Sequence, residues 1–172
     1  PFPVSLLDRK DLPFEAIDQA IADHPLLTQL LKHPLLTWQQ IEKILTEINY
    51  QLAFTRLAAK HPNTAAATLV EIAKNFDLEI ALAIAARDNA PATLVAEMVE
   101  AIFNRHFHKS EMKQEMLAFA RHPNLPARAQ KEIMAKAGSF SEVRLELAKQ
   151  PFLQTGVAQE LYNLAVKPGA QA

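Results

Sequence analysis

Apolar residues recur at helical spacing along most of the chain, and polar residues fill the positions between them. The clearest stripe lies in residues 38–49, where five apolar residues are expected to face inward: Trp38, Ile41, Ile44, Leu45 and Ile48. Residues 78–87 are apolar nearly all round, so this segment is expected to be deeply buried. The chain contains only three glycines. Strong helix formers dominate, and the pattern predicts an all-α protein.

Prolines and capping residues set the expected ends of these helices. A proline keeps the preceding residue out of helical geometry, so the His-Pro steps at 33–34, 61–62 and 122–123 should end helices. Caps are expected at Thr37 with Gln40, Thr64, Asp77, Ser110, and Ser139 with Glu142, and Gly138 should end a helix. The predicted helices cover residues 13–23, 26–32, 38–49, 51–60, 65–75, 78–87, 91–105, 111–121, 126–137, 141–149 and 155–166.

A short sequence motif, which we call the phrase, recurs along the chain at the end of every second predicted helix. Residues 57–64 read Leu-Ala-Ala-Lys-His-Pro-Asn-Thr, and residues 118–125 read Ala-Phe-Ala-Arg-His-Pro-Asn-Leu. Weaker copies occupy residues 31–34, 85–91 and 147–151. The phrase prolines Pro34, Pro62, Pro91, Pro123 and Pro151 are 28, 29, 32 and 28 residues apart. Such a period predicts a solenoid of stacked helix pairs, because one pair cannot bury its own apolar stripe.

Length and repeat spacing predict a single domain over residues 1–172. Residues 1–33 are expected to form an N-terminal cap, because the first helix carries acidic residues opposite its apolar stripe. Residues 34–151 should hold about four to five repeats, and residues 152–172 a final helix and tail.

Segments that contain or adjoin the phrase also resemble the repeats of a known family. Residues 143–151 resemble the second-helix signature of variant leucine-rich repeats, and residues 61–69 and 89–94 resemble the segment between its repeats. The resemblance implies a right-handed superhelix of the HEAT and armadillo kind. Some family members carry an iron–sulfur module held by cysteines, but this chain has no cysteine, so that function is not expected.

Charge and composition exclude several classes of protein. The net charge is −1 and the isoelectric point is near 6.7, so no global attraction to nucleic acid or membranes is expected. No apolar run approaches the length needed to span a membrane. We expect a soluble, cytoplasmic protein without membrane contact, present as a monomer or as part of a longer chain.

Each second helix carries a cation near its C-terminal end, and stacking would align these cations into a column: Lys32, Lys60, Arg87, Arg121 and Lys149. A column of cations suits an acidic peptide or a phosphate backbone. Cations at helix ends also complement the helix dipole, and we favour this interpretation because it applies to any helical protein. If a concave face binds a partner, the candidate residues are Arg56, Lys60, Arg87, Arg121, Arg144 and Lys149.

Histidines supply the remaining candidates. His33, His61 and His122 precede proline at equivalent positions, where packing at the turn is expected rather than metal binding. Where the repeat is longest, Arg105, His106, Phe107 and His108 predict an exposed interaction loop. A zinc or nickel site there would have too few ligands, even with Glu111, so no metal is expected.

No phosphate-binding loop, nucleophile elbow or zinc-protease motif is present. The sequence therefore predicts a helical-repeat scaffold that binds an unidentified protein, without catalysis or cofactor. The alternative is a nucleic-acid-binding repeat module that uses the same cations on a basic concave face. A more distant hypothesis is an enzyme built on helical repeats, as some DNA glycosylases are, which rests on similarity of architecture alone.

Overall fold

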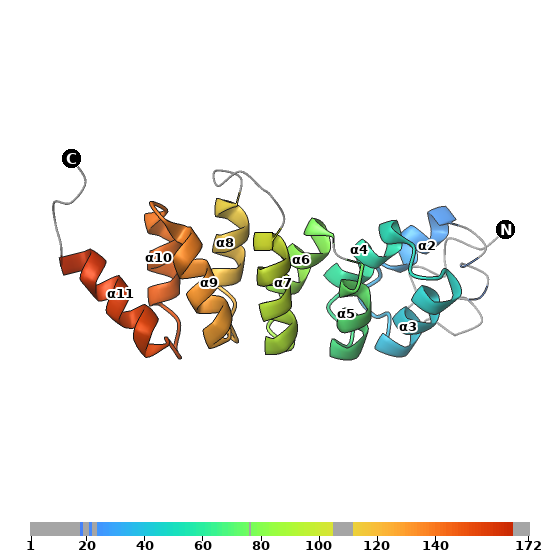
Figure 1. The fold of residues 1–172 in the computed structure, drawn as a ribbon. Coiled ribbons are helices and arrows are strands. Elements are labelled where there is room, and N and C mark those ends of the chain that lie inside the picture. The colour runs from blue at the N-terminus through green and yellow to red at the C-terminus, as the bar shows by residue number, and fades with distance from the viewer. Residues whose placement is uncertain (1–17, 19–20, 22–23, 76, 105–111, 167–172) are drawn as a thin grey trace. The chain divides into compact units, whose positions relative to one another are not determined.

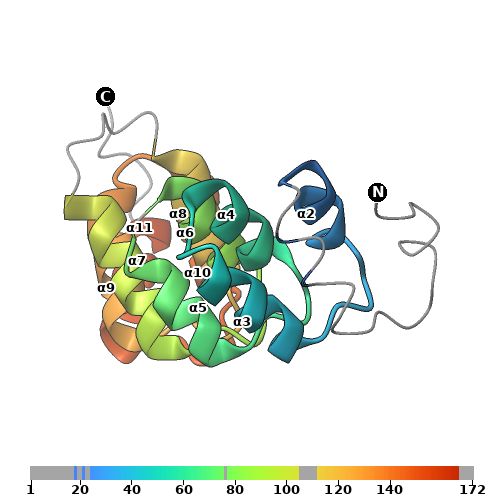
Figure 2. The same cartoon turned by 90° about the vertical axis from the view of Figure 1, so that its right-hand side faces the viewer.

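The computed structural model describes residues 18, 21, 24–75, 77–104 and 112–166. These residues form ten α-helices and no strand, as Figure 1 and Figure 2 show, and they confirm the all-α class. The helices are α2 (His24–Leu30), α3 (Trp38–Glu47), α4 (Leu52–Lys60), α5 (Ala66–Ala73), α6 (Leu78–Ala85), α7 (Ala92–Asn104), α8 (Lys113–Ala120), α9 (Ala127–Ala137), α10 (Ser141–Ala148) and α11 (Thr155–Val166).

The predicted helices from residue 26 onward agree with these bounds to within two residues at each end. Helix α4 ends directly before His61, and α8 ends two residues before His122, so the two phrases end helices as proline requires. Of the helix predicted over residues 13–23, the structure describes only Asp18 and Ile21, and both are helical.

Three of the predicted caps are present. At the start of α3 the Gln40 amide N–H donates to Thr37 Oγ1 at 3.3 Å, and the Thr37 amide N–H donates to Gln40 Oε1 at 2.8 Å. This is the reciprocal pair of a capping box. The Asp77 carboxylate accepts from the backbone N–H groups that begin α6. Gly138 follows α9 with φ 49°, a left-handed conformation that glycine adopts without strain.

Two caps were predicted wrongly. The Thr64 hydroxyl is buried and donates to the carbonyl of Ala58 at 2.5 Å, and α5 begins at Ala66 with Ala65 as an N-cap residue that has no capping side chain. The second capping box is also absent, because α10 starts after Phe140 and has no side-chain cap. The sequence could not show that Thr64 bonds to Ala58 or that Glu142 pairs with Lys113 of α8. Ser110 lies outside the described residues.

The inward position expected of Trp38 was also wrong, since 47% of this residue is exposed. The other members of its stripe, from Ile41 to Ile48, are buried as predicted. Trp38 is the first residue of α3, and a helical side chain points back toward the N-terminus. At this position it therefore projects past the end of the helix instead of onto the core.

The chain divides into two compact units, residues 1–84 and 85–172, which we describe separately. In the first unit α4 contacts both α3 and α5. The largest fully buried side chains of this unit come from α2, α3, α5, α6 and the segment between α2 and α3: Leu27, Leu30, Leu31, Leu36, Ile41, Ile44, Leu45, Leu69, Ile72 and Ile80. Helix α6 is buried at Ile80, Ala81 and Ile84, which confirms the deep burial expected from its apolar sequence.

In the second unit, helices contact both the next helix along the chain and the one after it. Helix α9 contacts α7 and α11, while α8 contacts α10, and α9 also packs against α8 and α10. In this unit α8 and α10, which precede a phrase, therefore lie beside each other, and α9, which follows a phrase, lies beside α7 and α11, which also follow one. We call the helices that precede a phrase the second helices (α2, α4, α6, α8, α10) and those that follow one the first helices (α3, α5, α7, α9, α11).

Truncation of Leu69 should destabilise the protein strongly. Leu69 is fully buried in α5, so Leu69→Ala should lower the free energy of unfolding by about 2–5 kcal/mol through lost burial and a cavity. Its neighbour Val70 is 38% exposed, and Val70→Ala is the matched control, with an expected loss below about 1 kcal/mol. Urea unfolding would measure both. Equal losses in the two variants would contradict the core assignment.

Candidate binding surface at the ends of the second helices

The phrase histidine of the first unit ties one turn to the turn before it. His61 is 4% exposed, and its Nε2 donates to the carbonyl of His33 at 2.8 Å. Its Nδ1 accepts from the backbone N–H of Asn63 at 3.1 Å. Because a carbonyl only accepts and an amide N–H only donates, these partners match the neutral ring protonated on Nε2.

The phrase asparagine adds to the same connection. The Asn63 amide Nδ2 donates to the carbonyls of Pro34 at 3.2 Å and Leu36 at 2.8 Å. These carbonyls lie in the connection between α2 and α3, where no helical partner is available to them. The side chains of one phrase thus satisfy backbone groups of the preceding phrase.

The second unit repeats this arrangement. His122 is 1% exposed, and its Nε2 donates to the carbonyl of Arg87 at 2.9 Å while its Nδ1 accepts from the Asn124 N–H. The Asn124 side chain donates to the carbonyl of Asp88 at 2.9 Å. In the copy over residues 147–151 Gln150 replaces histidine, and its Nε2 donates to the carbonyl of Ala120 at 2.6 Å. In all three places a side chain of one copy of the phrase therefore bonds to a backbone carbonyl of the copy before it, although the position of the acceptor differs by one or two residues.

Burial changes the acidity of His122. Loss of solvent around the ring lowers the pKa of His122 below its ordinary value of 6.5, although the hydrogen bond to Arg87 and the nearby Asp88 oppose this shift. The charged ring would also place a proton on Nδ1, facing the Asn124 N–H that this nitrogen accepts from. The folded protein therefore favours neutral His122.

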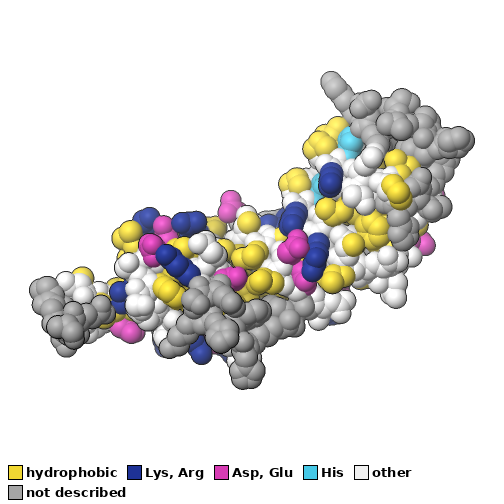
Figure 3. Space-filling view, turned by 90° about the horizontal axis from the view of Figure 1, so that it is seen from above, with side chains coloured by type: hydrophobic (Ala, Val, Ile, Leu, Met, Phe, Trp, Pro, Cys, Tyr) yellow, Lys and Arg dark blue, Asp and Glu magenta, His cyan; other side chains and the backbone are white. Residues whose placement is uncertain are grey.

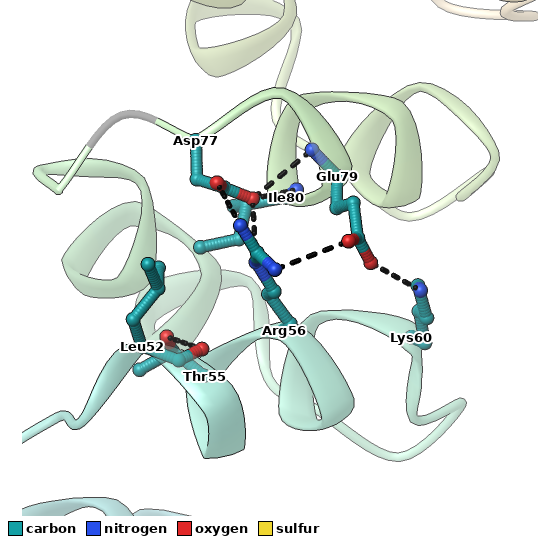
Figure 4. A network of polar contacts seen from close by, with 7 residues as sticks. All are labelled: Leu52, Thr55, Arg56, Lys60, Asp77, Glu79 and Ile80. Carbon is teal, nitrogen blue, oxygen red and sulfur yellow. Dashed lines mark hydrogen bonds and ion pairs between the residues drawn. The ribbon is translucent and has the colours of Figure 1, made fainter.

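The candidate cations of the first unit are held by carboxylates of the next second helix, as Figure 4 shows. Arg56 donates to both oxygens of Asp77, from Nε at 3.0 Å and from Nη2 at 2.6 Å, and its Nη1 lies 3.1 Å from Glu79. Lys60 Nζ donates to Glu79 Oε2 at 2.9 Å. The four side chains join α4 to the start of α6.

This network shifts the pKa of each carboxylate in it. The hydrogen bond from Arg56 lowers the pKa of Asp77, with further help from the backbone N–H groups of Ile80 and Glu79. The hydrogen bond from Lys60 lowers the pKa of Glu79, and the charge of Arg56 acts in the same direction. Both carboxylates therefore stay ionised and keep their cationic partners to lower pH than free carboxylates would.

The candidate cations of the second unit also have partners. Glu146 of α10 lies 3.0 Å from Lys149 and 3.7 Å from Arg121, so one carboxylate faces two of the candidates. Arg144 donates to the carbonyl of Gly138 at 2.9 Å. Arg87 donates to Asn89 Oδ1 at 3.0 Å, and partial burial lowers the pKa of its guanidinium. The structure thus places every one of these six candidate cations next to an acceptor of the same chain.

A shallow pocket lies at the phrase in each unit. In the first unit it has a volume of about 280 Å³ and is lined by Leu31, Lys32, Leu57, Lys60, His61 and Pro62. In the second unit it has a volume of about 320 Å³ and is lined by Ala85, Ala86, Asp88, Ala118, Arg121 and Pro123. Leu57, Lys60 and Pro62 occupy the same places in their phrase as Ala118, Arg121 and Pro123. Both units therefore carry a pocket at equivalent positions, with the phrase cations Lys32 and Lys60 in the wall of the first and Arg121 in the wall of the second.

Sequence reasoning missed the carboxylates that accompany the cations. Asp77 was identified only as a helix cap, and the roles of Glu79 and Glu146 were not foreseen. Glu79 lies 19 residues from Lys60, and no local pattern connects the two residues. Arg105, His106, Phe107 and His108, the predicted loop site, lie outside the described residues.

The described part of the chain has neither a group of metal ligands nor a membrane-spanning helix. In it, no three His, Asp or Glu side chains gather in a way that could hold a metal ion. None of its helices combines the length and apolar character that a membrane crossing needs. Comparison with protein-family models, with curated proteins and with solved structures finds no match to this chain.

Substitutions of Asp77 should separate its capping role from its charge. Asp77→Ala removes both the cap of α6 and the partner of Arg56, so we expect a loss of about 1–2 kcal/mol in the free energy of unfolding. Asp77→Asn keeps a good cap and should lose clearly less. The control is Glu71→Gln, which breaks only the exposed pair with Lys74 and should cost roughly 0.5 kcal/mol or less. Equal losses for Asp77→Asn and Asp77→Ala would show that the charge, and not the cap, carries the effect.

The stability of the protein should depend on pH through His122. The pKa of His122 is lowered in the folded state, so the unfolded chain takes up the proton first as pH falls through about 6.5. His122 therefore contributes full stability above that pH and progressively less below it. His122→Gln introduces the residue that occupies the same place, Gln150, in the copy over residues 147–151. Glutamine does not titrate, so this variant should lose the part of the pH dependence that comes from His122. Urea unfolding at pH 8 and pH 5 would compare the two proteins, with carboxylate effects cancelling in the difference. An unchanged pH dependence in the variant would contradict the assignment.

Proposed function

We propose that this chain is an α-solenoid of stacked helix pairs that binds a protein partner at the ends of its second helices. Two observations support the repeat architecture. At both His61 and His122 the buried ring bonds through Nε2 to a backbone carbonyl of the preceding copy of the phrase. In the second unit, first helices contact first helices and second helices contact second helices. A right-handed superhelix of the HEAT-like or variant leucine-rich repeat kind remains part of this proposal.

The pairing of the surface charges favours a protein as the partner. Glu79 stands between Arg56 and Lys60, and Glu146 lies beside Arg121 and Lys149. The face drawn in Figure 3 likewise mixes cationic, acidic and hydrophobic side chains. A surface that mixes paired charges with apolar side chains is compatible with a protein partner, because protein interfaces contain both polar and apolar area. The role of the surface is binding, with neither catalysis nor a cofactor in the proposal.

The alternative, a nucleic-acid interface, uses the same cations and fits this arrangement less well. Nucleic-acid affinity comes from cations that neutralise phosphates and release counterions. Here a phosphate would have to compete with Glu79 for Lys60, and with Glu146 for Lys149, while being repelled by both carboxylates. We therefore favour a protein partner.

Binding measurements with a triple variant would test this proposal. Lys32, Lys60 and Arg121, the exposed cations of the two phrase pockets, are changed together to Gln. Wild-type and variant proteins then serve as baits in nuclease-treated extract, with quantitative mass spectrometry as the readout. We expect specific proteins that the wild type retains and the variant loses. The matched control changes three exposed lysines of the first helices and their ends, Lys74, Lys131 and Lys136, and should retain these proteins.

A titration with single-stranded DNA and RNA of mixed sequence tests the alternative. Tight binding whose salt slope falls by roughly one unit for each cation removed would establish the nucleic-acid interface and overturn the proposal. Identical protein retention by the pocket variant and the control would overturn it as well.

A further inference from the structure

The carboxylate that faces Arg121 has a defined place in the repeat. Glu146 lies five residues before the phrase proline Pro151, and its Oε1 lies 3.7 Å from Arg121 Nη2. Arg121 belongs to the preceding copy of the phrase, two residues before Pro123. Helices α8 and α10, which carry the two charges at or near their ends, contact each other. In the second unit, a cation of one copy is therefore paired by a side chain of the next second helix.

The first unit has the equivalent cation but not the equivalent carboxylate. Lys32 lies two residues before its phrase proline, Pro34, as Arg121 does before its own. The residue five places before the next phrase proline, Pro62, is Leu57. Leucine therefore occupies, in the first unit, the place that Glu146 occupies in the second. Lys32 and Leu57 both line the pocket of the first unit, so the substitution changes the wall of that pocket.

Lys32 consequently differs from the other phrase cation of its pocket. Lys60 Nζ lies 2.9 Å from Glu79 Oε2, and Glu79 also pairs with Arg56. Within the part of the chain that the structure describes, the exposed side chain of Lys32 forms no ion pair or hydrogen bond. The pocket therefore presents the positive charge of Lys32 to solvent beside its apolar lining residues.

The size and lining of the pocket suit a side chain of a bound polypeptide. Its volume of about 280 Å³ is below the range of about 300–1,000 Å³ that is typical of small-molecule sites. Leu31, Leu57 and Pro62 supply apolar surface, and Lys32 supplies the charge. An apolar side chain would bury area against the two leucines. A carboxylate next to it in the bound chain would give Lys32 the pair that Glu146 gives Arg121.

The pocket of the second unit has different electrostatics. Its wall contains Asp88 and Arg121, and Arg121 already faces Glu146. Ala118 takes the place of Leu57, so less apolar surface is available. A carboxylate entering this pocket would be repelled by Asp88 and would compete with Glu146 for Arg121. Selection of an acidic residue is therefore expected at the pocket of the first unit.

We propose that the pocket of the first unit binds an acidic segment of the partner protein. An Asp or Glu of that segment pairs with Lys32, and a neighbouring apolar side chain packs against Leu31 and Leu57. This inference rests on the proposed function and specifies the chemistry of the partner at one place on the surface. A single carboxylate is enough to pair with Lys32, whereas a polyanion gains its affinity from several cations at once.

Selection from a library of random peptides displayed on phage would test the inference, with the full chain as bait. The wild type should enrich peptides that have Asp or Glu beside an apolar residue. Lys32→Gln should lose the preference for a carboxylate, and Lys32→Glu should select Lys or Arg in its place. Lys131→Gln changes an exposed lysine of α9 that lines neither phrase pocket, and this matched control should select the same peptides as the wild type.

Fluorescence anisotropy with one enriched peptide would measure the ion pair itself. Replacing the acidic residue of the peptide by its amide should raise Kd for the wild type by about two- to fivefold, the size expected of an exposed ion pair. The same replacement should leave Kd for Lys32→Gln unchanged. A peptide with lysine at that place should bind Lys32→Glu more tightly than it binds the wild type, because the charges are then exchanged. Leu57→Ala should weaken binding of every enriched peptide.

The inference and the proposed function can fail separately. Enriched peptides without a carboxylate preference, or equal selection by the wild type and Lys32→Gln, would overturn the inference. A charge exchange that fails to restore affinity would overturn it too. The proposed function is decided by the extract experiment, where the pocket variant and its control are compared for retained proteins. Proteins lost by that pocket variant would support the proposed function even where the peptides contradict the acidic segment.

Discussion

The connection between consecutive turns depends on side chains that bond to the backbone of the preceding turn. Each helix leaves carbonyl groups without helical partners at its end, and the phrase supplies donors to them: His61 and Asn63 in the first unit, His122 and Asn124 in the second. The rings of His61 and His122 are buried, so losing the carbonyl that either ring bonds to would leave a buried polar group unsatisfied. The proline of the phrase ends the helix, and the residues on either side of it fix where the next helix begins.

A buried amide side chain in α9 also bonds to backbone groups of neighbouring turns. Gln130 is 1% exposed, and its Nε2 donates to the carbonyls of Leu125 and Phe152, each at 3.0 Å. Its Oε1 accepts from the backbone N–H of Gln154 at 2.9 Å. One side chain thus satisfies three backbone groups on two successive turns. Burial of a polar residue at a stripe position is affordable here because every hydrogen-bonding group involved has a partner.

Charge pairing and apolar exposure divide the surface into two kinds. On the second helices, the acceptors beside Arg56, Lys60, Arg121 and Lys149 hold the cations in place and offset their charge. On α11, apolar side chains face outward without charged residues among them. The paired charges of the second helices leave little net charge at the phrase, which is the physical reason for favouring a protein over a polyanion there.

The sequence alone determined the helices and the repeated phrase, because both rest on local physics. Helical spacing of apolar residues, the capping box at Thr37 and the left-handed Gly138 involve residues close together in the chain. Tertiary structure decided which partner each polar side chain takes. Thr64 bonds to Ala58 instead of capping α5, Lys60 pairs with Glu79, and His61 bonds to His33, and each choice depends on which turns lie together. Exposure of Trp38 and Tyr162 was decided there as well, since a stripe shows that a face is apolar but not whether another helix covers it.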